Sequence, residues 1–140
     1  MHYWDSSSLV PLCVSEPSSG VLRNLAGGTS VVTWGGSLVE IASAIERRSR
    51  EGVLTADQRL EAHRNLRSLA AAWTEITALA PVRERALRLL ATHSLRASDA
   101  MQLAAALVAT SDRPQGHHFI CGDRRLLDAA TREGFTPATP

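Results

Sequence analysis

Four carboxylates stand where short apolar runs meet amphipathic stretches. They are Asp5 in YWDSSSLV, Glu40 in SLVEIASAI, Asp99 in LRASDAMQL and Asp123 in FICGDRRLL. Two carboxylates about 4 Å apart repel each other by roughly 4 kcal/mol at an effective dielectric near 20, so a cluster of them needs a cation. A divalent ion with oxygen ligands suits such a cluster, and it activates water for phosphodiester hydrolysis without a histidine base.

Two of these acids also have a purely structural interpretation as helix caps. Asp5 and Asp123 each follow an apolar run at the point where a helix is expected to begin. An aspartate in this position accepts hydrogen bonds from the free N–H groups of the first helical turn. Taken singly, neither residue distinguishes a cap from a ligand.

The other two acids lie just inside expected helices and have structural alternatives as well. Glu40 follows Ser37 with the S-x-x-E spacing of a capping box, and Asp99 follows Ser98, a candidate cap. At 100° per residue, Glu40 lies roughly opposite the apolar stripe of its own helix, so it faces either water or a polar cleft. Asp99 in a first turn complements the helix dipole.

Short apolar runs alternate with helical patterns along the chain. Strands are predicted at His2 to Trp4, Ser30 to Thr33, Glu75 to Leu79 and His118 to Cys121, with a fifth near Phe135. Helices are predicted from the stripes Leu38, Ile41, Ala42 and Ile45; Val82, Ala86, Leu89, Leu90 and His93; Ala100, Leu103, Ala104 and Leu107; and Leu126, Leu127 and Ala130. A further helix is predicted over Thr55 to Ala72, opening with a Thr55–Gln58 capping box.

This alternation predicts an α/β fold. We expect one domain over residues 1–140, with a central, mostly parallel sheet of four to five strands and helices on both faces. Sheets of this kind bind ligands at the carboxyl ends of their strands, where the four acids are expected to meet.

Composition limits the possible functions. The chain has 15 basic and 14 acidic residues, so its net charge carries no preference for nucleic acid, and every basic residue is an arginine. The two cysteines show neither metal-site spacing nor a disulfide framework, which favours a reducing, cytoplasmic location. No membrane-spanning segment is expected. Aromatic residues make up 4% of the chain, too few for a base-stacking platform.

The four acidic segments, in this order and over essentially the whole chain, resemble the motifs of PIN-domain ribonucleases, and specifically of VapC-type toxins from toxin–antitoxin pairs. The resemblance implies a PIN-like three-layer fold and an Mg²⁺- or Mn²⁺-dependent endoribonuclease whose acidic pocket is formed by Asp5, Glu40, Asp99 and Asp123. It also implies a cognate antitoxin protein and a homodimer as partners. The chain departs from the family pattern at Cys121, where Thr or Ser is common, and at Gly35–Gly36.

Roles follow from the preference of Mg²⁺ for one or two direct carboxylates and several waters. Asp5 and Asp99 are assigned as primary ligands, Asp123 as a ligand of a second ion or through water, and Glu40 as the group that positions the attacking water. Substrate contacts are expected from Arg47, Arg124 and Ser6, which are placed to bind RNA phosphates; solvated surface positions are the alternative for the two arginines.

Three other functions are weighed against this interpretation. Receiver domains and haloacid-dehalogenase-like phosphatases share the topology but use a lysine near the phosphoryl group, and this chain has none. A catalytically inactive PIN-like module that binds RNA or protein stays open, and so does an RNA-processing nuclease that is not a toxin. Metal-dependent cleavage separates the inactive module from the nucleases.

Overall fold

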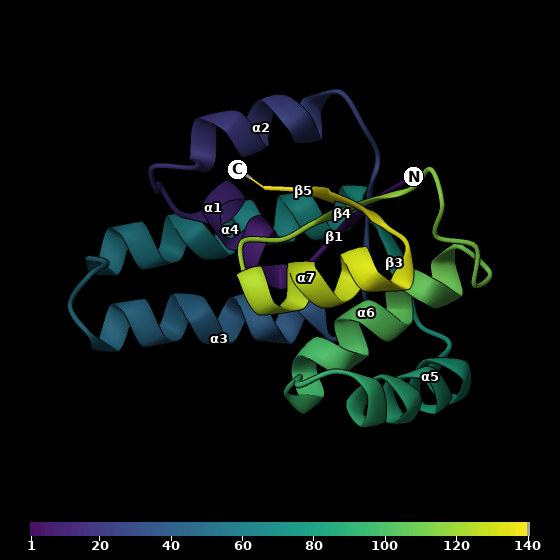
Figure 1. Cartoon of the computed structure of the whole chain (residues 1–140). Coiled ribbons are helices and arrows are strands. Elements are labelled where there is room, and N and C mark those ends of the chain that lie inside the picture. Colours follow the sequence, from purple (N-terminus) through teal and green to yellow (C-terminus); the bar gives the residue numbers. More distant parts are fainter. Residues whose placement is uncertain (140) are drawn as a thin grey trace.

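A five-stranded parallel sheet lies between two layers of helices in the computed structural model, which describes residues 1–139 (Figure 1). The strand order is β3-β2-β1-β4-β5. The strands are β1 (His2–Trp4), β2 (Val31–Trp34), β3 (Thr74–Ile76), β4 (His118–Ile120) and β5 (Thr136–Ala138). The predicted α/β three-layer architecture is confirmed. The fifth strand, which was predicted near Phe135, is β5.

Seven helices connect the strands in the described part of the chain. They are α1 (Ser6–Cys13), α2 (Ser19–Gly27), α3 (Ser37–Arg50), α4 (Ala56–Ala72), α5 (Leu79–Thr92), α6 (Ala97–Ala109) and α7 (Arg124–Glu133). Helix α4 begins as predicted, because Thr55 and Gln58 form the reciprocal hydrogen bonds of a capping box. None of the helices among residues 1–139 is long and apolar enough to cross a membrane.

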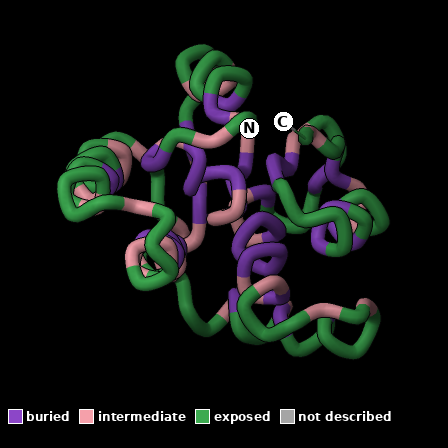
Figure 2. Tube along the Cα trace, turned by 90° about the vertical axis from the view of Figure 1, so that its left-hand side faces the viewer, coloured by how far each residue is buried: buried purple, intermediate pink, exposed green. Residues whose placement is uncertain are grey.

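Side chains that alternate along the strands produce two separate cores. Tyr3 and Phe119 pack with residues of α5, α6 and α7 on one face of the sheet, whereas Trp4 and Ile120 pack with residues of α1, α2, α3 and α4 on the other. This is the period-two alternation of a strand buried on both faces. Figure 2 shows the result: buried residues occupy the centre of the molecule and exposed ones the outer turns of the helices.

The structure corrects several predicted boundaries. The run predicted as a strand over Glu75 to Leu79 ends at Ile76, and Leu79 begins α5. Pro81 in the first turn of α5 is consistent with this boundary, because proline is well tolerated at a helix start. Leu38, which was predicted to lie on the buried stripe of α3, is 40% exposed.

Helix α2 was not predicted. Its apolar stripe is short: Leu22, Leu25 and Ala26 stand at i, i+3 and i+4, and of these only Leu22 is fully buried. The chain adopts this helix because Leu22 packs into the same core as Trp4.

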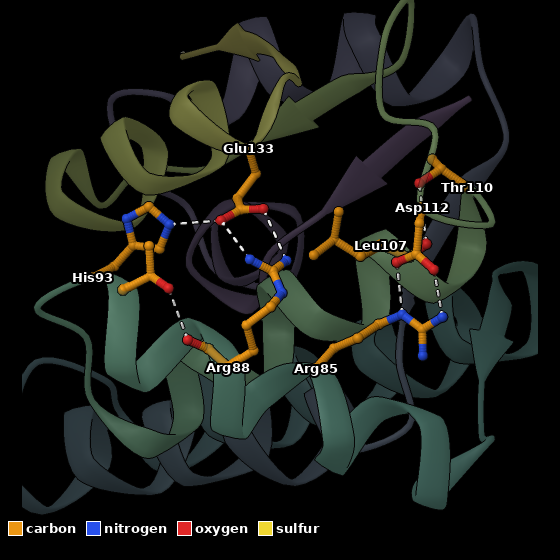
Figure 3. A network of polar contacts seen from close by, with 8 residues as sticks. Arg85, Arg88, His93, Leu107, Thr110, Asp112 and Glu133 are labelled. Atoms are coloured by element: carbon orange, nitrogen blue, oxygen red, sulfur yellow. Dashed lines mark hydrogen bonds and ion pairs between the residues drawn. The ribbon is translucent and has the colours of Figure 1, made fainter.

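A polar network ties α5 to the end of α7 on the face of the sheet that contains Phe119 (Figure 3). Arg88 donates to both oxygens of Glu133, at 2.9 and 3.2 Å, and Nε2 of His93 lies 2.7 Å from Oε1 of the same carboxylate. Burial opposes ionisation of Glu133, but the hydrogen bonds from Arg88 and His93 outweigh it and hold the pKa of Glu133 below its usual value. Nearby, Arg85 makes a similar forked contact with the more exposed Asp112.

Replacing Glu133 by Gln is expected to lower the free energy of unfolding by about 1 to 2 kcal/mol at pH 7, because the charge-assisted bonds are lost. A carboxyl whose pKa is lowered on folding stabilises above its unfolded pKa of about 4.3, and this stabilisation disappears as the pH falls through the folded pKa. The difference between the two proteins should therefore shrink in acid. Thermal unfolding at pH 7 and in acid, followed by circular dichroism, measures it.

Asp112→Asn serves as the control, because the side chain of Asp112 is 54% exposed against 13% for Glu133. An exposed ion pair contributes little to stability, so this variant should unfold close to the wild type. Equal losses in the two variants would contradict the importance of the Glu133 network.

Candidate functional site: an acidic pocket at the carboxyl edge of the sheet

The site lies where the direction of the strand order changes. The chain enters the sheet at β1, passes to β2 and β3 on one side, and returns to β4 and β5 on the other. Asp5 follows β1 directly, and Asp123 follows β4 after a short turn. Because neighbouring parallel strands end at the same edge, a crevice forms between these two ends, which is where open α/β sheets bind ligands.

All four predicted acids line one pocket of about 600 Å³. The pocket is bordered by the first half of α1, by most of the length of α3, by the start of α6 and by the residue before α7. Its lining consists of Asp5, Ser6, Ser7, Val10, Val39, Glu40, Ser43, Ala44, Arg47, Arg48, Arg96, Ser98, Asp99 and Asp123. The four sequence segments that carry the acids are thus brought together by the fold.

Asp5 is the most deeply buried of the four acids, with 4% of its surface exposed. It is the N-cap of α1: its Oδ2 accepts from the backbone N–H of Ser7 at 3.0 Å and also from the Ser7 hydroxyl. The thiol of Cys121 lies 3.6 Å from the same oxygen. Burial raises the pKa of Asp5, although the bonds from Ser7 act in the opposite direction. The capping interpretation is therefore correct, and the capping residue also lines the pocket.

Asp123 is likewise a cap that faces the pocket. Its Oδ1 accepts from the backbone N–H of Leu126 at 3.1 Å, at the start of α7. Its own backbone N–H donates to the sulfur of Cys121 at 3.2 Å. Cys121 consequently contacts both Asp5 and Asp123. Its thiol lies at the position where the PIN-domain motifs that the sequence resembles commonly have a Thr or Ser hydroxyl.

Glu40 does not form the capping box that its spacing from Ser37 allows. The N-cap of α3 is Gly36, and Ser37 is buried within the first turn. The carboxylate of Glu40 instead turns to the pocket, where Oε2 accepts from the hydroxyl of Ser6 at 2.6 Å and Oε1 accepts from the amide of Gln102 at 3.3 Å. Burial raises the pKa of Glu40, despite the Ser6 bond. The polar-cleft alternative for Glu40 is the correct one.

The turn before Glu40 is shaped by glycine. A Cβ at Gly36 would lie 2.4 Å from the indole nitrogen of Trp34, so only glycine lets this ring pack against the turn. The Gly35–Gly36 pair thus provides the space in which Trp34 packs against the start of α3.

Asp99 occupies the first turn of α6, as predicted, but Ser98 is not the cap. The N-cap position belongs to Arg96, without a side-chain hydrogen bond, and Ser98 lies inside the helix. Burial and the negative charge of Asp123 raise the pKa of Asp99. The acids therefore disfavour one another's ionisation, and this is the condition that a bound cation relieves.

The donor set fits a hard divalent cation with few direct protein ligands. Every acid in the pocket offers carboxylate oxygens, and the half-open pocket leaves room for water around an ion. Within residues 1–139, no group of three or more His, Cys, Asp or Glu side chains is arranged to hold a single metal ion. Carboxylate oxygens of this kind suit Mg²⁺, which keeps several waters and binds through one or two carboxylates.

Three arginines and a serine supply the opposite charge and polarity at the rim. Arg47, Arg48 and Arg96 line the pocket together with Ser6. The guanidinium of Arg48 also forms an ion pair of 2.6 Å with Glu16. Arg124 is not among the lining residues, so the structure brings the predicted substrate-contact residues Arg47 and Ser6 to the pocket and leaves Arg124 outside it.

Sequence reasoning missed three contributors to the site: Ser7, Arg48 and Gln102. The first stands beside a recognised acid, and its side chain bridges Asp5 and the backbone N–H of Gly122. Gln102 gave a weak signal, because a polar residue stands within the otherwise apolar stretch MQLAAAL. A buried amide of that kind must find partners, which marks it as part of a polar network.

Comparisons with known proteins support the fold alone. No protein-family model matches the chain, and neither does the sequence of any curated protein. Among solved structures, PAE2754 from Pyrobaculum aerophilum is similar with a TM-score of 0.69 at 17% identity, over 97% of this chain and 87% of that one. FitAcB from Neisseria gonorrhoeae is similar with a TM-score of 0.68 at 15% identity, over 97% of each chain. The chain has the predicted PIN-like three-layer α/β fold.

Proposed function

We propose that the protein is a metal-dependent endoribonuclease that acts as the toxin of a toxin–antitoxin pair. One observation carries the proposal: four acids from four separate segments line a single pocket at the carboxyl edge of the sheet. The order of the acidic motifs and the PIN-like fold support the same activity. The similarity to FitAcB supports the fold on which such a site would be built, and the toxin role rests on the resemblance of the acidic motifs.

The residues of the pocket divide into three roles. Asp5 and Asp99 would hold Mg²⁺ or Mn²⁺, and Asp123 would bind a second ion or contact the first through water. When bound, the ion makes water more acidic and stabilises the negative charge that develops on the phosphodiester. Glu40 accepts a hydrogen bond from the attacking water and so orients it toward phosphorus.

The rim of the pocket binds the substrate. Arg47 and Arg96, which line the pocket, offer guanidinium groups to RNA phosphates, and such contacts position the strand without reading its sequence. Ser6 holds Glu40 through its hydroxyl and so lies beside the reacting groups. The acids alone would repel RNA, so the arginines and the cation together make the pocket able to accept a polyanion.

The direct test is cleavage of total cellular RNA by the purified protein with Mg²⁺ or Mn²⁺, compared with excess chelator. We expect discrete fragments with either ion and intact RNA with chelator. Intact RNA under every condition would contradict the nuclease proposal and favour a module that binds RNA or protein without cutting. Cleavage without any effect on growth would favour an RNA-processing nuclease.

A second expected result concerns stability. Mg²⁺ or Mn²⁺ should raise the melting temperature of the wild type, because an ion that binds only the folded state stabilises it by RT ln(1 + [L]/Kd), which is about 2.7 kcal/mol at a hundredfold excess over Kd. The ion should stabilise Asp5→Asn less. Differential scanning fluorimetry at matched ionic strength measures both shifts, and equal shifts would place ion binding outside the pocket.

A further inference from the structure

A buried polar network lies behind Glu40, and Gln102 is at its centre. Gln102 is on α6, one turn after Asp99, and only 1% of its surface is exposed. Its carbonyl oxygen accepts from the hydroxyl of Tyr3 at 2.7 Å, and its amide nitrogen donates to Ser37 Oγ at 2.9 Å and to Glu40 Oε1 at 3.3 Å. An amide buried this deeply destabilises the fold unless its polar atoms find such partners.

The direction of the hydrogen bonds follows from the number of protons. The Thr33 hydroxyl donates its one proton to the backbone carbonyl of Trp4 at 2.8 Å. Its other contact, 2.6 Å from Ser37 Oγ, must then be donated by Ser37. Ser37 has no second proton to give, so it accepts from Gln102, and the NH₂ group of Gln102 faces the pocket side of the network.

This orientation determines how Glu40 is held. One N–H of Gln102 goes to Ser37 and the other to Oε1 of Glu40, while the Tyr3 hydroxyl occupies the amide oxygen. The second carboxylate oxygen of Glu40 accepts from Ser6. Both oxygens therefore have a donor, which restricts rotation of the carboxylate and favours its ionised form.

We propose that Gln102 is the positioning residue for Glu40, and that Tyr3 fixes the amide of Gln102 in the orientation that this requires. Gln102 contacts neither the substrate nor an ion; it acts through the carboxylate it holds. The inference rests on the proposed nuclease activity, in which Glu40 orients the attacking water. A displacement of about 1 Å in such a group costs up to roughly a hundredfold in rate.

Two variants separate positioning from stability. Gln102→Leu removes the donor to Glu40 and leaves the buried Tyr3 hydroxyl without the acceptor of its proton, so it should both melt at a lower temperature and lose activity. The double variant Tyr3→Phe with Gln102→Leu removes the orphaned hydroxyl as well, and replacing both partners by apolar groups is nearly neutral. The double variant should therefore recover much of the melting temperature but none of the activity.

The activity assay uses a pool of short random-sequence RNAs with Mg²⁺ or Mn²⁺. In both variants we expect the apparent kcat to fall about tenfold or more while the apparent KM stays within about twofold, because the phosphate-binding arginines are untouched. A residue with a merely structural role would give activity that follows melting temperature. Wild-type kcat in the double variant would overturn the inference while the nuclease proposal stands.

A second readout does not depend on activity. The Glu40 carboxyl carbon, followed by NMR as a function of pH, reports the hydrogen bond from Gln102 directly. Its titration midpoint should move to higher pH in the double variant, whereas Tyr3→Phe alone should cause a smaller shift. If the wild type fails to cut RNA, the nuclease proposal falls, and the titration midpoint of Glu40 then decides whether Gln102 holds this carboxylate. A midpoint that is the same in the double variant and the wild type overturns the inference.

Discussion

Asp5→Asn is expected to reduce metal-dependent RNA cleavage by about a hundredfold or more while the fold survives. The substitution removes a proposed ion ligand at the base of the pocket but keeps a side-chain oxygen for the backbone N–H of Ser7. Asparagine caps helices about as well as aspartate, so the start of α1 should be preserved. Cleavage of total cellular RNA with Mg²⁺ or Mn²⁺ measures the loss.

The same variant should keep or raise its stability in the absence of metal. Burial raises the pKa of Asp5, so the folded state binds this proton more tightly than the unfolded state does. Such a group contributes stability at low pH and loses it as the pH rises through the unfolded and then the folded pKa. At neutral pH the ionised Asp5 therefore opposes folding, and its neutral replacement removes that cost.

Asp57→Asn provides a matched control, because Asp57 is an exposed acid in the first turn of α4 and does not line the pocket. This control should cut RNA at the wild-type rate. Near-normal cleavage by Asp5→Asn would contradict the assignment of Asp5 as a ligand. A large loss of stability in Asp5→Asn would contradict the inference that the buried, ionised carboxylate of Asp5 opposes folding at neutral pH.

Expression of the wild-type chain alone is expected to arrest bacterial growth, whereas Asp99→Asn should accumulate without harm. The reason is that Asp99 lies in the pocket, where it is proposed to hold the ion, and its amide replacement keeps the shape of the α6 start. Colony counts and growth curves after induction, with immunoblots to equalise protein levels, measure the difference.

Co-expression with the protein encoded by the adjacent small gene should restore growth. An inhibitor that inserts an arginine or lysine among the acids would bind through charge complementarity, and Asp99→Asn keeps three of the four acids, so it should still bind the partner. Co-purification tests this binding. If the wild type and Asp99→Asn are equally harmless in a host that contains the natural RNA target, the toxin assignment fails and an RNA-processing nuclease or an inactive module takes its place.

Local patterns were sufficient to predict most elements of the fold. The alternation of apolar runs with helical stripes predicted the layers, and the Thr55–Gln58 capping box predicted the start of α4, because each depends on residues a few positions apart. Helix α2 was missed because its apolar stripe, formed by Leu22, Leu25 and Ala26, spans little more than one turn. The end of β3 was misplaced because the apolar run continues into α5, which begins at Leu79.

The acids were recognisable in the sequence because each stands at a junction between two elements, and parallel topology gathers such junctions at one edge of the sheet. Their partners were not recognisable. Local spacing suggested that Glu40 would bond with Ser37, three residues away, but its carboxylate bonds with Ser6 and Gln102, which are 34 and 62 positions distant. By itself, the sequence determined the order of elements and the four acids at their ends, because these depend on short-range periodicity and chain direction. Only the tertiary structure decided which donors hold each acid and which arginines reach the pocket. These contacts join segments that are far apart in the sequence, and the packing of α1, α3 and α6 on the sheet sets the distances between them.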